Sequence, residues 1–257
     1  MLDLKDKVIV VTGSSKGFGL AIGRLLLQKQ AKVVFCSRSM ETSKSSLGID
    51  SAKSFPINLD ICDIKSIRHA RSKILDRFGS IDIVVNNAGD NGRVCRLIDC
   101  EPGEERNIFE THVFGTLNMI REFVPTMRNS GSGIIVNFAS IIGYVPMPGS
   151  SAYSAAKAAI VSLTTSLRHE LKSEGIDLRL FVPTHATNGH NIDRATQNTP
   201  ESVAKTFVDA LQAGRSSFIS EGFLVNLKRL LPRTTQSIMN STGEGALKVN
   251  LPGTRQG

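Results

Sequence analysis

Tryptophan is absent from this chain of 257 residues, and only two tyrosines are present. The four cysteines (Cys36, Cys62, Cys95 and Cys100) show no CxxC spacing, and Cys36 falls within a strand that we expect to be buried. Zinc sites and disulfide frameworks depend on closely and regularly spaced cysteines. We therefore expect reduced thiols, no metal site and a cytoplasmic compartment.

Long apolar runs and linkers are also lacking. No run is long enough to span a bilayer, and we expect no signal peptide because residues 1–6 lead directly into the first strand. No stretch rich in Pro, Gly or Ser divides the chain, which favours a single domain.

The formal net charge is +8, and part of this excess lies in residues 222–257, where five cations accompany one glutamate. Nucleic-acid-binding domains combine such charge with a recognisable motif or with aromatic residues between the cations. Neither accompanies the basic residues here, so we expect no nucleic-acid partner.

Apolar strands alternate with amphipathic helices through most of the sequence. The strands are expected at 7–12, 31–37, 53–57, 81–86, 133–139, 177–182 and 217–220, and the helices at 20–30, 63–78, 104–129, 151–173 and 201–213. This alternation predicts an α/β fold, a doubly wound parallel sheet of Rossmann type covered by helices on both faces. We expect one three-layered domain over residues 1–239, including an amphipathic extension at 222–239, and a flexible tail at 240–257.

A glycine-rich turn joins the first strand to the first helix. Glycines permit a tight turn and the close approach of a phosphate to the helix N-terminus, whose free N–H groups favour anions. The turn predicts a dinucleotide site, although such a sequence can also be only a turn. The residues expected to bind are Gly13, Ser15, Lys16, Gly17, Phe18 and Gly19.

Ser37 and Arg38 follow the second strand, where NAD sites usually place a carboxylate for the ribose hydroxyls. Arg38 and Lys16 are suited to clamp a 2′-phosphate instead, which favours NADP(H) over NAD(H). The alternative is that both are solvated surface cations.

Tyr153 and Lys157 lie four residues apart on a predicted helix, so their side chains share one face. The ammonium can lower the pKa of the phenol and make it a general acid or base. Ser140 ends a buried strand, where chemistry in open α/β sheets is usually found.

Taken together, these motifs resemble the short-chain dehydrogenase/reductase family over residues 5–220. The resemblance rests on the TGSSKGFG turn, Asp60, the Asn86-Asn87-Ala88-Gly89 loop, Ser140 and the Tyr153–Lys157 pair. It implies that Tyr153 exchanges the proton, that Lys157 tunes the phenol and holds the nicotinamide ribose, and that Ser140 binds the substrate oxygen. It also implies that the loop at 86–89 lines the cofactor and that Asp60 and Ile61 contact the adenine.

Three features depart from the family pattern. His112 occupies the position where the family usually has an Asn that helps to hold a water near the Lys. The alternatives are that His112 relays protons itself, that it is a tolerated substitution with lower turnover, or that it abolishes activity. Thr184 follows Pro183 where Gly is common, while Thr187 keeps a cofactor-contacting position. The sequence at 221–239 lacks the glycine-rich closing strand of bacterial 3-oxoacyl-carrier-protein reductases and loosely resembles branches that act on apolar ketones.

The extension carries Phe223, Leu227, Leu230 and Leu231 on one helical face. Such a helix covers a substrate pocket, packs in a homodimer or homotetramer, or touches an anionic membrane. The substrate walls are expected in the loop after Gly89 and at 142–148 and 184–199.

We therefore expect an NADP(H)-dependent oxidoreductase acting on a ketone or secondary alcohol, most readily the reduction of an apolar or lipid-like carbonyl. Two alternatives are a dedicated enzyme of secondary metabolism and a cofactor-binding protein with little or no turnover.

Overall fold

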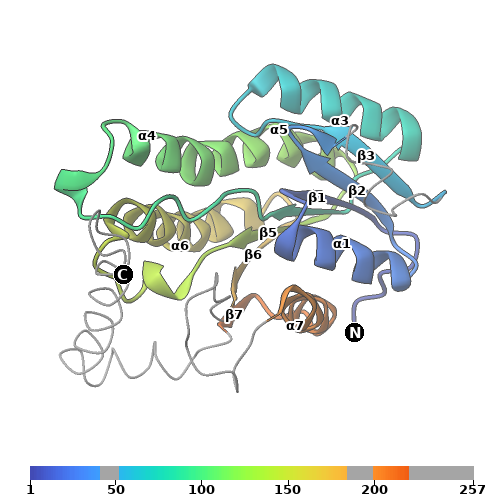
Figure 1. Ribbon diagram of the computed structural model, residues 1–257. Helices are drawn as coiled ribbons and strands as arrows, with labels where there is room; N and C mark the ends of the chain where they lie inside the picture. Colours follow the sequence, from blue (N-terminus) through green and yellow to red (C-terminus); the bar gives the residue numbers. More distant parts are fainter. Residues whose placement is uncertain (41–51, 184–198, 220–257) are drawn as a thin grey trace.

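The computed structural model describes residues 1–40, 52–183 and 199–219 (Figure 1). Within these ranges the strands are β1 (Val8–Thr12), β2 (Lys32–Ser37), β3 (Ser54–Asn58), β4 (Ile83–Asn86), β5 (Gly133–Phe138), β6 (Ile176–Val182) and β7 (Ser217–Ile219). The α-helices are α1 (Gly17–Gln28), α3 (Ile64–Phe78), α4 (Glu104–Phe109), α5 (Thr116–Asn129), α6 (Ser151–Lys172) and α7 (Pro200–Gln212). Short turns are the 3₁₀ segments η1 (Leu97–Asp99) and η3 (Ile141–Gly143) and the π-helical η2 (Glu110–Gly115).

All strands pair in parallel in a seven-stranded sheet of order β3-β2-β1-β4-β5-β6-β7. The chain starts in the middle of the sheet, winds outward to β3, and then returns to continue from β4 on the other side of β1. The point where the direction reverses lies between β1 and β4, which is where open α/β sheets bind ligands at the carboxyl ends of their strands. The predicted doubly wound Rossmann-type fold is confirmed.

Helices cover both faces of the sheet (Figure 1). On one face α1 and α7 pack together over Ile9, Val11 and Phe35. On the other face α3, α5 and α6 cover Val8, Val10 and neighbouring strand residues. Every side chain of β1 is buried, because a parallel sheet between two helical layers has no solvent-facing side.

Several helix ends follow the expected local signals. The Asp63 side chain accepts a hydrogen bond from the Lys65 N–H (2.9 Å) at the start of α3, and Gly79, with φ of +76°, ends that helix. Thr199 caps α7 in the same way through the Ser202 N–H. The helix predicted over 104–129 is present, but a π-helical turn interrupts it at η2.

Some expectations lie outside the described residues. These are the cofactor contacts of Thr184 and Thr187, the substrate wall at 184–198, the extension at 222–239 and the tail at 240–257. Among the helices that the structure does describe, none combines the length and the apolar character that crossing a bilayer requires.

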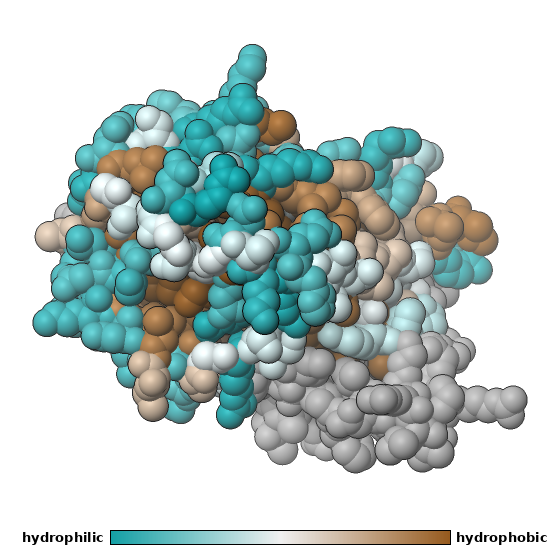
Figure 2. Space-filling view, turned by 180° about the vertical axis from the view of Figure 1, so that it is seen from behind, coloured by the Kyte–Doolittle hydropathy of each residue, from teal (hydrophilic) through white to brown (hydrophobic). Residues whose placement is uncertain are grey.

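Figure 2 shows the rear face, where hydrophilic residues predominate and hydrophobic residues form separate patches. Apart from Met1, the most exposed large hydrophobic side chains of the described ranges are Leu97 and Ile98, which are 62% and 83% exposed. Both lie on η1, in the segment between β4 and α4.

Candidate active site

The glycine-rich turn folds as a tight passage from β1 into α1. A Cβ added at Gly19 would lie 2.4 Å from the Gly13 carbonyl oxygen, and one added at Gly13 would lie 2.7 Å from the Ala88 Cα. Gly17 differs, since a Cβ there would meet nothing within 4 Å, and its φ is +57°. The first two glycines therefore allow backbone contact, while Gly17 leaves space at the helix N-terminus.

The start of α1 keeps its first N–H groups available. Lys16 occupies the N-cap position without a side-chain hydrogen bond, and no acidic residue lies in the first turn. An uncapped helix N-terminus beside an open glycine is suited to bind an anion. Of the other predicted contacts in this turn, Ser15 is partly exposed and Phe18 packs against the core.

Two side chains from neighbouring strands hold this turn in place. Asn87 donates from Nδ2 to the carbonyl oxygens of Thr12 (2.9 Å) and Gly13 (3.3 Å). The Thr12 hydroxyl accepts hydrogen bonds from the N–H groups of Asn87 and Ala88, both at 3.0 Å. Asn87 was predicted to contact the cofactor. In the structure its side chain stabilises the glycine-rich turn that would bind the cofactor phosphates.

The end of β2 supplies an unsatisfied polar atom. The Ser37 hydroxyl is buried and finds no hydrogen-bond partner among the residues that the structure describes. Buried hydroxyls are normally paired, so this one is available to a ligand. Next to it in sequence Arg38 is exposed, as is Lys16, and neither forms an ion pair with a described residue.

The remaining predicted cofactor residues follow the carboxyl ends of the other strands. Asp60 and Ile61 come after β3, and the Asp60 carboxylate accepts from the Cys62 N–H at 2.9 Å. Ala88 and Gly89 come after β4, and Pro183 comes directly after β6. Because parallel strands end at the same edge, the sheet brings all these residues to one side of the molecule.

Ser140 and Tyr153 meet beside this edge. Ser140 follows β5, Tyr153 lies in the first turn of α6, and the Ser140 hydroxyl lies close enough to the phenol to lower the pKa of Tyr153. Lys157 follows one turn later, is buried, and donates from Nζ to the Phe138 carbonyl oxygen at 2.8 Å. Its Nζ lies 5.5 Å from the centre of the Tyr153 ring.

Burial dominates the protonation of this cluster. It raises the pKa of Tyr153 to about 12, assisted by the negative charge of Asp90 and opposed by the nearby Ser140 hydroxyl. It lowers the pKa of Lys157 to about 7, because the buried ammonium has no carboxylate partner among the described residues. Burial is the largest influence on the pKa of Tyr153 in this structure, and the expectation that Lys157 lowers it stays a prediction.

His112 belongs to the same cluster. The π-helical η2 places it against Tyr153, with ring centres 5.1 Å apart in an edge-to-face arrangement. Its Nε2 lies 2.7 Å from the Asp90 carbonyl oxygen, which can only accept, so Nε2 carries the proton and donates it. Burial, together with the charge of Lys157, lowers the pKa of His112 to about 3.

The fit around His112 explains why a glycine stands at position 89. A Cβ at Gly89 would lie 2.1 Å from the imidazole Cε1, and the φ of Gly89 is +138°. Only glycine leaves room for the ring at this position. Gly89 and His112 therefore fit together as a pair, which the sequence did not reveal.

A shallow cleft, open to solvent, borders Tyr153. Its walls combine polar and apolar groups from the loop after β4, from α4 and from the start of α6. The lining residues are Asn91, Arg93, Cys95, Leu97, Cys100, Glu104, Glu105, Ile108, Gly149, Ser150, Ser151, Ala152 and Tyr153.

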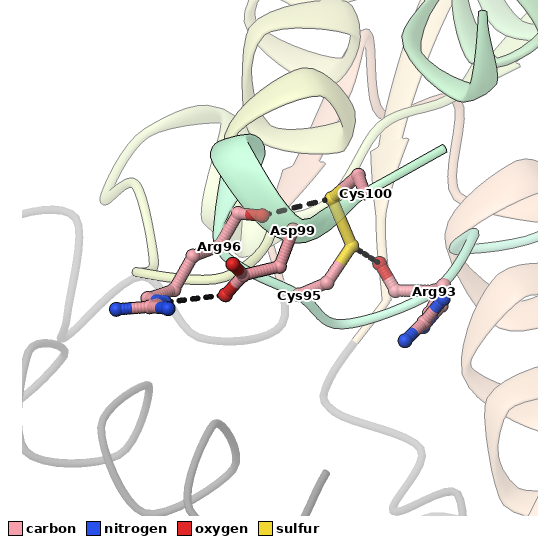
Figure 3. Close-up of a disulfide and its surroundings, with 5 residues drawn as sticks. All are labelled: Arg93, Cys95, Arg96, Asp99 and Cys100. Carbon is pink, nitrogen blue, oxygen red and sulfur yellow. Dashed lines mark hydrogen bonds and ion pairs between the residues drawn. A yellow bond between two sulfur atoms is a disulfide. The ribbon is translucent and has the colours of Figure 1, made fainter. Parts of the chain in front are cut away.

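One expectation about the cysteines is wrong. Cys95 and Cys100 form a disulfide (Figure 3). Cys36 is buried and free, and Cys62 is exposed and free. The 3₁₀ turn η1 brings the two Cα atoms to 5.8 Å, a normal disulfide separation, although the spacing matches no familiar motif. The disulfide lies in the wall of the cleft.

A buried polar chain behind the site also escaped sequence reasoning. Asn86 donates from Nδ2 to Asn137 Oδ1 (2.8 Å), and Asn137 donates to the Thr164 hydroxyl (3.0 Å). This chain ties β4, β5 and α6 together. The signal available in the sequence was a polar residue within each of two apolar strands.

Comparison with known proteins agrees with this geometry. The family model described as short chain dehydrogenase matches residues 7–198. The chain therefore belongs to the short-chain dehydrogenase family of oxidoreductases.

The similar curated proteins carry related names. The ketoacyl reductase HetN of Nostoc sp. is 30% identical over 82% of this chain and 77% of its own length. Dehydrogenase/reductase SDR family member 7B of Xenopus tropicalis is 28% identical over 92% of this chain and 85% of its own. An uncharacterized oxidoreductase of Staphylococcus aureus strain MW2 is 32% identical over 82% of this chain and 93% of its own.

Solved structures share the fold. A short-chain dehydrogenase/reductase from Burkholderia phymatum, determined in complex with NAD, superposes with a TM-score of 0.80 at 21% identity, covering 93% of this chain and 98% of that one. A short-chain dehydrogenase from Streptomyces avermitilis gives a TM-score of 0.77 at 26% identity, covering 94% and 98%.

Proposed function

We propose that this chain is an NADP(H)-dependent oxidoreductase that transfers a hydride between nicotinamide and a ketone or secondary alcohol. The observation that carries the proposal is the cluster of Ser140, Tyr153 and Lys157 at the carboxyl edge of the sheet, where Ser140 is close enough to Tyr153 to lower the pKa of the phenol against the effect of burial. The family to which the chain belongs supports the same reaction class.

The residues at the edge of the sheet fit a dinucleotide. The open space at Gly17 and the free N-terminus of α1 suit its phosphates. The unpaired Ser37 hydroxyl and the cations Lys16 and Arg38 suit the adenosine ribose and a 2′-phosphate. The absence of a carboxylate directly after β2 favours NADP(H) over NAD(H).

The mechanism follows from the protonation of the cluster. When bound, the nicotinamide supplies or accepts the hydride. With a pKa of about 12, Tyr153 is protonated at neutral pH and can donate its Oη proton to a carbonyl oxygen. Ser140 can donate a hydrogen bond to the same oxygen and stabilise the negative charge that develops there.

Lys157 and His112 would then act on Tyr153 from two sides. Lys157, with a pKa of about 7, is able to hold or release a proton near neutral pH and so to return one toward Tyr153. His112 stays neutral at this pH, so we assign it to positioning the phenol and the Asp90 carbonyl rather than to carrying charge. Its Nδ1 lone pair remains able to hold a water, as the relay hypothesis requires.

The substrate is proposed to be a carbonyl compound with an apolar body. Leu97 and Ile108 line the cleft and support this, and the similarity to a protein named ketoacyl reductase points to the same chemistry. Arg93, Glu104 and Glu105 add polar groups that an oxygenated substrate could contact. Homo-oligomer formation, membrane contact through 222–239 and a cytoplasmic location remain predictions.

Cofactor choice is tested by titrating the protein into NADPH or NADH and following the fluorescence of the reduced nicotinamide. We expect NADPH to bind at least about 10-fold more tightly, and Arg38→Ala to weaken NADPH by about 10-fold while changing NADH little, because it removes one charge-assisted contact. Arg121→Ala, at an exposed position on α5, serves as the matched control. Tighter NADH binding, or equal loss in the Arg121 variant, would contradict the assignment.

A further inference from the structure

The disulfide between Cys95 and Cys100 does not stand alone in the cleft wall. The two sulfurs and a carboxylate oxygen of Glu104 all lie within 4.8 Å of one another. Cys95 is buried, whereas Cys100 and Glu104 are partly exposed. The Glu104 carboxylate forms no hydrogen bond or ion pair with any residue in the described part of the chain.

These three groups match a recognised kind of ligand set. Thiolates and carboxylates bind Zn²⁺ in roughly tetrahedral sites, with metal–ligand distances of about 2.0–2.3 Å. Such a site needs its ligand atoms about 3.5–4 Å apart, which small side-chain rotations reach from the present cluster. The thiolate is the ligand, so the disulfide must first be reduced.

The backbone around the cysteines is held by contacts that do not involve the sulfurs. The Cys95 N–H donates to the Gly149 carbonyl (3.0 Å), directly before the helix that carries Tyr153. The Asp99 N–H donates to the Arg96 carbonyl (2.8 Å), and the Arg96 and Asp99 side chains form an ion pair (Figure 3). We therefore expect the turn to keep its conformation, and the two thiols to stay close together, when the sulfur–sulfur bond is reduced.

We propose that Cys95, Cys100 and Glu104 form a redox-gated site for a thiophilic divalent cation of the Zn²⁺ type at the mouth of the catalytic cleft. In a reducing compartment, close cysteine pairs are more often metal-binding or catalytic than permanently bridged. Three protein ligands leave a fourth position open to water or to an oxygen of a bound molecule.

The chemistry balances in two steps. A dithiol reductant supplies two electrons and two protons, the bond between the Cys95 and Cys100 sulfurs breaks, and the reductant becomes a disulfide. Zn²⁺ then replaces the two thiol protons, which are released to solvent, and Glu104 provides the third ligand. In the reverse step a disulfide-type oxidant takes two electrons from the two thiolates and two protons from solvent, becoming two thiols; the bond between the Cys95 and Cys100 sulfurs re-forms and the metal is released.

The site is tested by measuring Zn²⁺ binding to one chain in its two redox states. The protein is reduced with a dithiol, desalted without oxygen, and titrated with Zn²⁺ against a chromophoric chelator; a second sample is kept oxidised. We expect one Zn²⁺ per reduced chain and none per oxidised chain. Maleimide labelling after unfolding in denaturant reports four free thiols in the first sample and two in the second, because buried Cys36 reacts only in the unfolded chain.

Variants separate this site from other thiols. We expect Cys95→Ser and Cys100→Ser each to weaken Zn²⁺ by at least about 100-fold and Glu104→Gln by about 10-fold, since each removes one ligand. Cys62→Ser and Glu105→Gln are the matched controls and should leave the affinity unchanged. Equal binding by reduced and oxidised protein, or an effect of Cys62→Ser as large as that of Cys95→Ser, would overturn the proposal.

Discussion

At the scale of single residues, burial decides the chemistry of the site. Tyr153, Lys157 and His112 come from two helices, and desolvation is the largest influence on the pKa of each. The first two residues were predicted as a pair, because a spacing of four on a helix places side chains on one face. The effect of burial on their pKa values was not predicted, since it depends on how completely the surrounding chain excludes water.

His112 gives this residue-scale account a pH dependence. Its pKa is about 3 in the folded protein and 6.5 as an ordinary histidine. Between these values the unfolded chain binds one more proton, so the free energy of unfolding falls as the pH drops from 6.5 toward 3. Between pH 7 and pH 4.5 we expect the free energy of unfolding to fall by about 2–3 kcal/mol less in His112→Asn than in the wild type, as measured by urea unfolding.

The wild type and His112→Asn contain the same carboxylates, so the difference between their stability curves removes the contribution of those carboxylates to the pH dependence. If the two stability curves run parallel from pH 7 to pH 4.5, His112 is not buried in its neutral form. The same curves separate the positioning role from a cationic relay, because a relay needs a histidine that gains its proton near neutral pH.

At the scale of elements, helix and strand boundaries followed local signals closely. Asp63 and Gly79 delimit α3 as capping rules predict, and the strands appear as the continuous apolar runs typical of a parallel sheet. The π-helical turn η2 and the disulfide across η1 were missed, because neither has a sequence signature that can be read without tertiary contacts.

The glycine-rich turn gives the element-scale prediction. Asn87 is its main external support, through hydrogen bonds to the Thr12 and Gly13 carbonyls. We expect Asn87→Ala to lower the free energy of unfolding by about 1–3 kcal/mol, because two carbonyls lose a partner, and to weaken cofactor binding as well. Denaturant unfolding and cofactor titration measure the two effects.

Asn129→Ala, at the exposed end of α5, is the matched control and should change stability by less than about 0.5 kcal/mol. Asn87→Ala with unchanged stability would show that the turn holds its shape without this side chain.

At the scale of the whole molecule, the topology explains why residues far apart in sequence form one site. Parallel strands in the order β3-β2-β1-β4-β5-β6-β7 bring Gly13, Ser37, Asp60, Gly89 and Ser140 to one edge. The sequence predicted this arrangement because strand–helix alternation admits few topologies. It predicted the loop after Gly89 as one wall of the cleft, but it did not reveal the parts supplied by α4 and the start of α6. The segment 142–148, also expected as a wall, does not line the cleft.

The central claim is that Tyr153 donates the proton that accompanies hydride transfer, and turnover of Tyr153→Phe tests it most directly. The assay follows absorbance of the reduced nicotinamide with the carbonyl substrate that a screen shows to be reduced fastest, and cofactor titration confirms that binding is retained. We expect kcat to fall by about 10²–10⁴-fold with an unchanged cofactor affinity, because only the phenolic proton is removed. Near-normal kcat in this variant would contradict the account.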